Sequence, residues 1–150
     1  MTHTGTCGSL LTVIIELEPK PTSADLASLS RGLVASNDAH GPPEEWRRVT
    51  FFLRDDKGVV FGGLDGNTYW GWLFVRQLWV DAAHQRCGHG TALLSAAERE
   101  AGNRGCDKAH LDTFDFQALA FYRKLGYSVF GELTDFPPGH TRYFLVKHGL

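Results

Sequence analysis

The sequence has 150 residues, 43% of them hydrophobic and 12% aromatic, which suits one domain with one buried core. Its 15 Lys and Arg against 17 Asp and Glu give a net charge of −2, which argues against nucleic-acid binding. The apolar runs fall short of the roughly 20 residues that span a membrane, and the polar start of the chain has no signal-peptide pattern. We therefore expect a single cytoplasmic domain over residues 1–150, with neither membrane nor nucleic acid as a partner.

The three cysteines, Cys7, Cys87 and Cys106, are odd in number and unrelated in spacing, so we interpret them as reduced thiols. Cys87 lies between His84 and His89, which could suggest a metal site. A closed zinc site uses four ligands in recurring pairs, and no second pair is present. The sequence therefore predicts no metal.

The first half of the chain predicts mainly strands. Residues 9–17 are rich in Val, Ile and Leu and favour a strand, whereas residues 23–35 repeat apolar residues at helical spacing behind the capping candidate Ser23. Residues 49–54 and 59–64 flank an Asp-Asp-Lys-Gly turn and predict a β-hairpin.

A second turn is predicted at Asp65-Gly66-Asn67. The following run, residues 69–80, is aromatic and β-branched without proline, and predicts one central strand covered on both faces.

In the second half, helical and strand patterns alternate. The predicted helices cover residues 91–102 and 117–125, and the predicted strands cover residues 108–114, 127–133 and 141–146. The resulting order, β-α-β-β-β-α-β-α-β-β, indicates an α/β fold with a mixed sheet and helices on both faces.

The stretch with the clearest chemical meaning is Gln85-Arg86-Cys87-Gly88-His89-Gly90-Thr91, which follows the strand end Leu78-Trp79-Val80 and opens a helix. N–H groups at a helix start lack intrahelical partners and favour an anion. Two glycines let a phosphate approach, and an arginine adds charge. On spacing alone, an ordinary strand-to-helix turn explains the pattern equally well. A Lys-containing phosphate loop and a dinucleotide fingerprint do not fit.

These residues resemble the signature of the GCN5-related N-acetyltransferase (GNAT) superfamily, Gln/Arg-x-x-Gly-x-Gly/Ala after a Leu-x-Val strand. A second family element, Ala-x-x-Phe-Tyr-x-x-x-Gly-Phe/Tyr, is similar to the run from Ala118 to Tyr127. The resemblance covers residues 49–146. It departs from the family at Asp115, with Gln117 nearby, where relatives often carry an asparagine.

The resemblance implies a mostly antiparallel sheet with a splayed central strand, and transfer of acetyl from acetyl-CoA to a primary amine of a small molecule by direct attack on the thioester. The pantetheine arm would pair with the central strand, and the pyrophosphate would bind the loop amides. The implied acetyl-CoA-binding residues are Leu78, Trp79, Val80, Gln85, Arg86, Cys87, Gly88, His89, Gly90, Thr91, Asp115, Gln117 and Tyr122. A homodimer is also expected, with the strand over residues 141–146 offering an edge or face.

Tyr122 is the implied catalytic residue, donating a hydrogen bond to the leaving thiolate, because a phenol stays protonated at neutral pH. Packing beside Phe121 is the alternative role. Many relatives place an acid midway along the central strand, but this chain has Phe74, Val75, Arg76 and Gln77 there. The candidates for the base are Asp81, His84, Asp112 and water.

Aromatic residues gather in segments expected near the acceptor amine, together with acidic residues. They fit a buried core with a solvated surface, or a site for a small organic cation. The two sets are Trp46, Tyr69, Trp70, Trp72, Phe136 and Tyr143, and Asp38, Glu44, Glu45, Asp65 and Asp135. A non-catalytic acyl-CoA-binding or regulatory domain of the same fold is the alternative function.

Overall fold

The computed structural model describes residues 13–150, and the chain divides into two compact units at Gly41 and Pro42. The first unit contains α1 (Ser23–His40), the predicted helix, extended at its end. Its cap is Thr22 rather than Ser23, because the Thr22 hydroxyl accepts a hydrogen bond from the amide of Asp25 at 3.1 Å. Neither α1 nor another helix of the described residues is long and apolar enough to cross a membrane.

The strand predicted over residues 9–17 is not observed where it can be checked. Residues 9–12 lie outside the described residues, and residues 13–17 form no regular element. A strand needs a partner strand, and the described part of the first unit offers none. The prediction of one domain for the whole chain stays a prediction.

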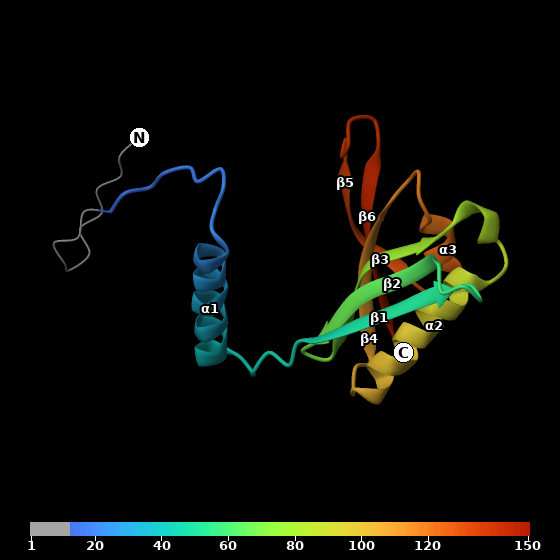
Figure 1. Cartoon of the computed structure of the whole chain (residues 1–150), viewed down its shortest axis with the longest axis horizontal. Helices are drawn as coiled ribbons and strands as arrows, with labels where there is room; N and C mark the ends of the chain where they lie inside the picture. The colour runs from blue at the N-terminus through green and yellow to red at the C-terminus, as the bar shows by residue number, and fades with distance from the viewer. Residues whose placement is uncertain (1–12) are drawn as a thin grey trace. The chain divides into compact units, whose positions relative to one another are not determined.

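The second unit is built on a six-stranded sheet in the order β1-β2-β3-β4-β6-β5 (Figure 1). All neighbours are antiparallel except β3 and β4, which confirms the mixed, mostly antiparallel sheet. Because β6 lies between β4 and β5, it offers no free edge, and the edge strands are β1 and β5. The elements are β1 (Arg47–Arg54), β2 (Val60–Tyr69), β3 (Trp72–Val80), the 3₁₀ helix η1 (Ala82–His84), α2 (His89–Asn103), β4 (Lys108–Phe114), α3 (Leu119–Lys124), β5 (Ser128–Thr134) and β6 (Thr141–His148).

The predicted turn at residues 65–67 and the single strand over residues 69–80 are wrong. Residues 65–67 lie inside β2, and the chain reverses at Trp70 and Gly71, whose φ angles are 46° and 77°. Gly66 faces the Phe74 carbonyl so closely that a Cβ would overlap it. This glycine therefore serves a close approach of two strands rather than a turn.

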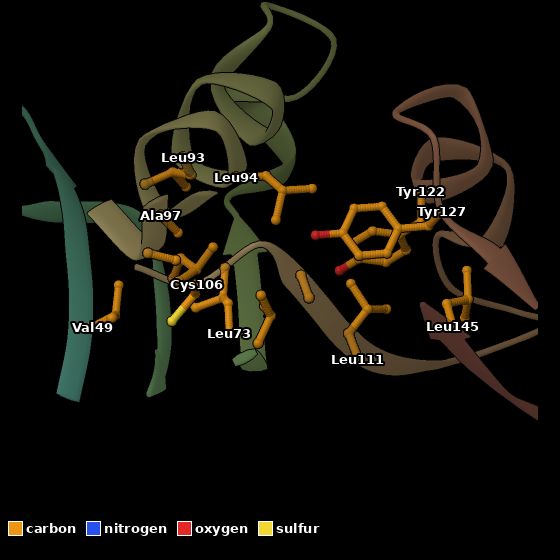
Figure 2. Close-up of a cluster of buried hydrophobic side chains, with 14 of the residues drawn as sticks. Val49, Leu73, Leu93, Leu94, Ala97, Cys106, Leu111, Tyr122, Tyr127 and Leu145 are labelled. Atoms are coloured by element: carbon orange, nitrogen blue, oxygen red, sulfur yellow. The ribbon is translucent and has the colours of Figure 1, made fainter. Parts of the chain in front are cut away.

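Helix α2 covers one side of β1, β2 and β3. Its buried residues Leu93, Leu94 and Ala97 point toward the sheet residues Val49 and Leu73 (Figure 2). This apolar stripe is the one that the helical spacing predicted. Helix α2 thus packs on β3 through buried apolar side chains.

Strands β3 and β4 separate part-way along their length. They pair only from Trp72 to Val75 on β3, whereas β3 stays paired with β2 as far as Val80. Arg76 is an extra residue at this point, because Val75 pairs with Gly66 and Gln77 pairs with Asp65. A bulge bends its strand and increases the local twist, which turns β3 away from β4. The splayed central strand is thus present, and a β-bulge accompanies it.

Candidate functional site

A cleft of about 1080 Å³ opens where β3 and β4 separate. Its walls come from the end of β3, the loop that leads into α2, the end of β4 and the start of α3. Eleven of the thirteen residues expected to bind the cofactor line it. They are Leu78, Trp79, Val80, Gln85, Arg86, Gly88, His89, Gly90, Thr91, Gln117 and Tyr122.

One wall of the cleft is a strand edge without a partner. Beyond Val75, no strand within residues 13–150 pairs with the β4 side of β3. The amide nitrogen of the Gln85 side chain donates to the carbonyl of Val80 at 3.0 Å and ties the loop to the end of this strand. An extended, amide-containing ligand can therefore pair with this edge as an added strand.

The loop presents a row of amides at the start of α2. Arg86 and Gly88 have φ angles of 62° and 83°, so the backbone turns twice before the helix begins. Within the described residues, no backbone or side-chain group accepts a hydrogen bond from the amides of residues 86–91. Together with the helix dipole and the Arg86 side chain, these amides are arranged so that they could hold an anion such as a phosphate.

Cys87 and Asp115 are the two expected cofactor residues that do not line the cleft. The thiol of Cys87 lies 3.5 Å from the carbonyl oxygen of Gln85, within its own loop. The Asp115 carboxylate accepts a hydrogen bond from the amide of Thr141 at 3.1 Å and lies 3.0 Å from Nδ1 of His140. Asp115 therefore fastens the start of β6.

Gln117 lines the cleft, but its side chain forms hydrogen bonds within the turn that precedes α3. Its side-chain oxygen accepts hydrogen bonds from the amide of Phe114 at 3.1 Å and from the hydroxyl of Thr113 at 3.2 Å. These bonds fix the connection between β4 and α3.

Tyr122 on α3 is 6% exposed, yet it lines the cleft. Burial, with a smaller effect of the nearby Asp112 carboxylate, raises the pKa of Tyr122 to about 12. Its ring lies beside that of Tyr127, with centroids 5.9 Å apart (Figure 2). The Tyr127 hydroxyl donates to Glu98 at 2.9 Å, whereas the Tyr122 hydroxyl has no partner among the described residues. The Tyr122 side chain is thus buried and protonated, and its hydroxyl is free to donate a hydrogen bond to a ligand in the cleft.

The base candidates are scattered. His84 and Asp112 line the cleft, and Asp81 does not. Asp81 caps η1 by accepting from the amide of Ala83 at 3.0 Å. His84 lies in η1, beyond the end of β3 at Val80, whereas the strands separate after Val75, about 17 Å back along β3. Asp112 stands at that point, but Arg142 holds its Oδ2 with two nitrogens, each at 2.7 Å.

A second anchored carboxylate supports the bulge. Asp65 on β2 accepts hydrogen bonds from Nε of Arg48 at 2.8 Å and from the Thr50 hydroxyl at 2.7 Å, and lies 3.3 Å from Arg76. The hydrogen bond from Arg48 is the main reason that the pKa of Asp65 is lowered. Because Arg48 and Arg76 both lie against its carboxylate, Asp65 is a poor base, and it holds the bulge residue Arg76 in place.

A smaller aromatic pocket of about 420 Å³ adjoins the paired part of β3 and β4. From the aromatic set of the sequence, Tyr69, Trp70 and Trp72 line it, whereas none of the five acidic residues does. Sequence reasoning missed His110 and Phe130, although the alternation in strand 108–114 already placed His110 on the face opposite the core. We call this hollow the aromatic pocket; its lining is Tyr69, Trp70, Trp72, His110, Phe130 and Val146.

In the described part of the chain, no group of three or more His, Cys, Asp or Glu side chains could hold a metal ion.

The acetyltransferase (GNAT) family matches residues 22–127 of the chain. The chain belongs to this family. A relative, the blasticidin-S acetyltransferase of Streptomyces morookaense, is 42% identical over 93 residues, which are 61% of this chain and 68% of the relative. An acetyltransferase of Agrobacterium fabrum is 37% identical over 115 residues, 77% of this chain and 84% of the relative. A crystal structure of an Agrobacterium tumefaciens acetyltransferase superposes with a TM-score of 0.85 at 32% identity, covering 91% and 99% of the two chains.

The two sequence elements of this GNAT acetyltransferase that carry the family resemblance meet in the structure. A Cβ built on Gly90, in the first element, would lie 3.4 Å from the ring of Phe121, in the second. Both residues line the cleft. Elements that are far apart in the sequence thus form one site.

Proposed function

We propose that this protein transfers the acetyl group of acetyl-CoA to the primary amine of a small molecule, by direct attack of the amine on the thioester. The observation that supports it best is the continuity of the cleft. An unpaired edge of β3 leads, within one hollow, to the unpaired amides at the start of α2. Acetyl-CoA has amide groups in its pantetheine arm and phosphates farther along the molecule. The β3 edge can pair with the amide groups, and the amides at the start of α2 can bind the phosphates, in the same order along the cleft.

The residues present fit acetyl-CoA as the co-substrate. Leu78, Trp79 and Val80 would hold the pantetheine arm through the free strand edge. The amides from Arg86 to Thr91 would hold the pyrophosphate, because Gly88 and Gly90 leave them uncovered. Once bound, acetyl-CoA supplies the activated acetyl group, and the protein supplies position and proton handling.

Tyr122 has the properties of a hydrogen-bond donor to the departing sulfur. Its pKa of about 12 lies above the ~8.5 of a thiol, so the proton stays on the phenol while it stabilises the thiolate. A group that lost its proton to the sulfur would need a lower pKa. We therefore assign to Tyr122 stabilisation of the leaving group rather than full proton transfer.

A named relative supports a small molecule as the acceptor. The relative that is 42% identical is named for the acetylation of blasticidin-S, which supports a small molecule as the acceptor. A cytoplasmic location and a homodimer are part of the same proposal. The competing function, a non-catalytic acyl-CoA-binding or regulatory domain, would use the same cleft without turnover.

Two measurements on the purified protein test the proposal. Calorimetry reports binding of acetyl-CoA, and a thiol reagent reports release of CoA in the presence of a panel of amine-bearing metabolites and antibiotics. We expect binding, and amine-dependent thiol release with at least one small amine. Binding without release on every amine would favour the non-catalytic alternative, and absence of binding would contradict both functions.

A further inference from the structure

The aromatic pocket and the cleft are neighbours on the sheet. Asp112 lines the cleft and His110 lines the pocket, and the two residues are separated by one position on β4. Residues i and i+2 of a strand point to the same face, about 7 Å apart. Val75, the last residue of β3 that pairs with β4, also lines the cleft. The aromatic pocket therefore adjoins the end of the cleft at which β3 and β4 separate.

We propose that the aromatic pocket binds the acceptor amine and that His110 is the base that takes its proton. This inference rests on the proposed function and adds to it a substrate class and a catalytic residue. The class is a primary alkylamine that carries a flat ring system, such as an arylalkyl or heteroarylalkyl amine, whose nitrogen is protonated at pH 7.

The placement of His110 supports its role. Its ring is parallel to that of Phe74, with centroids 4.7 Å apart and an interplanar angle of 12°. Phe74 and His110 are register partners across β3 and β4, so β4 places an imidazole beside the central strand. No group of the described residues forms a hydrogen bond with either ring nitrogen, so both nitrogens can serve a ligand.

The surroundings keep His110 neutral. Its strand neighbours are Phe74 on β3 and Val146 on β6, and both are apolar. Burial lowers the pKa of His110, and the nearby Asp112 carboxylate only partly opposes this. The other titratable or charged groups near the pocket are Tyr69, which lines it, and Lys108 and His148, which contact the ring of Trp72. Arg142, farther along β6, is paired with Asp112. A neutral imidazole at pH 7 can accept a proton.

The lining of the aromatic pocket decides the class of amine. Tyr69, Trp70 and Trp72 offer ring faces, while no carboxylate from the described part of the chain lines the pocket. Flat rings stack on such faces, and an ammonium group gains only their weaker cation–π attraction. A site without a carboxylate also disfavours the charged form of the amine, which helps its deprotonation.

The reaction balances with these residues. The acceptor arrives as an ammonium ion and gives one proton to His110, which frees the nitrogen lone pair. The nitrogen then forms the C–N bond to the acetyl carbon, and the C–S bond breaks as sulfur leaves with its electrons, next to Tyr122. The second proton lost by the nitrogen ends on the sulfur, and His110 returns its proton to water. The products are the acetamide and the free thiol of CoA.

The first test follows the pH dependence of kcat/KM for wild type and His110→Gln with the most active amine of the panel. The wild type is expected to level off above about pH 6.5, whereas the variant should lose roughly 10²-fold at pH 7 and rise with unit slope toward the amine pKa near 10. His148→Gln is the matched control, because that ring also lies near Trp72, at 6.0 Å, but does not line the pocket. An unchanged profile in a folded His110→Gln protein overturns the assignment. An unchanged dissociation constant for acetyl-CoA, and the same result with His110→Asn, exclude misfolding.

The second test needs no acetyl-CoA. NMR titration of the free protein should place the His110 pKa below 6.5, and calorimetry should show tighter binding of tryptamine than of butylamine. Trp70→Ala should reduce that preference about 2- to 10-fold. Equal binding of the two amines overturns the pocket assignment. If the wild type releases no thiol with any amine, the proposed function itself fails, which is a different outcome from an active enzyme that tolerates His110→Gln.

Discussion

Gly66 on β2 packs directly against the carbonyl oxygen of Phe74 on β3, with no room for a Cβ between them. The contact lies beside the bulge at Arg76, where β3 turns away from β4. The shape of the cleft thus depends on a glycine in the neighbouring strand, outside the cleft itself.

Gly66→Ala should therefore destabilise the protein. The methyl group would overlap backbone atoms, which cannot move without breaking the ladder, so we expect a loss of about 1–3 kcal/mol. Gly102→Ala is the control, because a Cβ at Gly102, in α2, meets nothing within 4 Å and alanine suits a helix better than glycine. Urea unfolding should show the first variant weakened and the second unchanged or slightly stabilised. Equal stability of the two variants would contradict this account of Gly66.

Gly88→Ala should weaken acetyl-CoA binding. Gly58 offers a matched control, since Gly58 and Gly88 have φ angles of 81° and 83° and both face open space. Alanine at either site costs about 1–2 kcal/mol of stability through backbone strain. Only the change at Gly88 should also raise the dissociation constant for acetyl-CoA, and Gly88→Val should raise it further, as should Gly90→Val. Calorimetry on the folded variants decides, and equal affinities would remove the loop from the binding site.

Tyr122→Phe should slow the chemical step while leaving acetyl-CoA affinity unchanged. The variant keeps the ring and removes the donor, so we expect turnover to fall about 10²- to 10⁴-fold. Because the Tyr122 pKa is about 12, turnover should show no loss from its ionisation below pH 10. Normal single-turnover acetylation by the variant would leave Tyr122 with a packing role alone.

Tyr127→Phe is the matched control for Tyr122→Phe. Its hydroxyl donates to Glu98, which also pairs with Lys147 at 2.8 Å, and Tyr127 does not line the cleft. Loss of a hydrogen bond to a charged group should cost about 1.5–3 kcal/mol of stability. Turnover per folded molecule should stay normal, which separates stability from chemistry.

Asp65 should contribute stability that disappears in acid. Its pKa is lowered in the folded protein, so the unfolded chain binds more protons when the pH falls below the usual value of 3.8. The stabilisation is therefore fully present above about pH 5 and is lost as the pH falls through the folded pKa. Asp65→Asn should flatten the slope of unfolding free energy between pH 5 and 2 relative to the wild type. The same acid slope in the variant and the wild type would contradict the role of Asp65.

The chain should form a homodimer. Edge strand β5 carries the exposed side chain of Leu133, which does not line the aromatic pocket and which a partner could cover. Light scattering at high concentration should give twice the 16.6 kDa of one chain. A single-chain mass would contradict the prediction, and loss of the dimer in Leu133→Lys would place the contact on β5.

The features that the sequence predicted are those encoded locally. The stripe of Leu93, Leu94 and Ala97 identified α2 by its spacing, and the Asp-Asp-Lys-Gly run identified the first hairpin. The loop over residues 85–91 could also be predicted as a strand-to-helix connection with unpaired amides, because glycines and a helix start are local features of the sequence. Its binding of an anion stays a prediction. Each of the two family elements is a continuous run of residues, so both could be recognised in the sequence, and both contribute residues to the lining of the cleft.

Contacts between strands distant in the sequence could not be predicted in this way. Asp65 and Gly66 suggested a turn by their residue types alone. The sequence does not show that Gly66 lies against Phe74 or that Asp65 pairs with Arg76. His110 was missed as a base because its position beside Phe74 depends on the parallel register of β3 and β4. Local patterns determine which elements form, but register, bulge and burial arise only when the elements pair. The sequence by itself thus determined the helices, most strands and the glycine-containing loop before α2, whereas the tertiary structure decided where β3 and β4 separate and which side chains meet there.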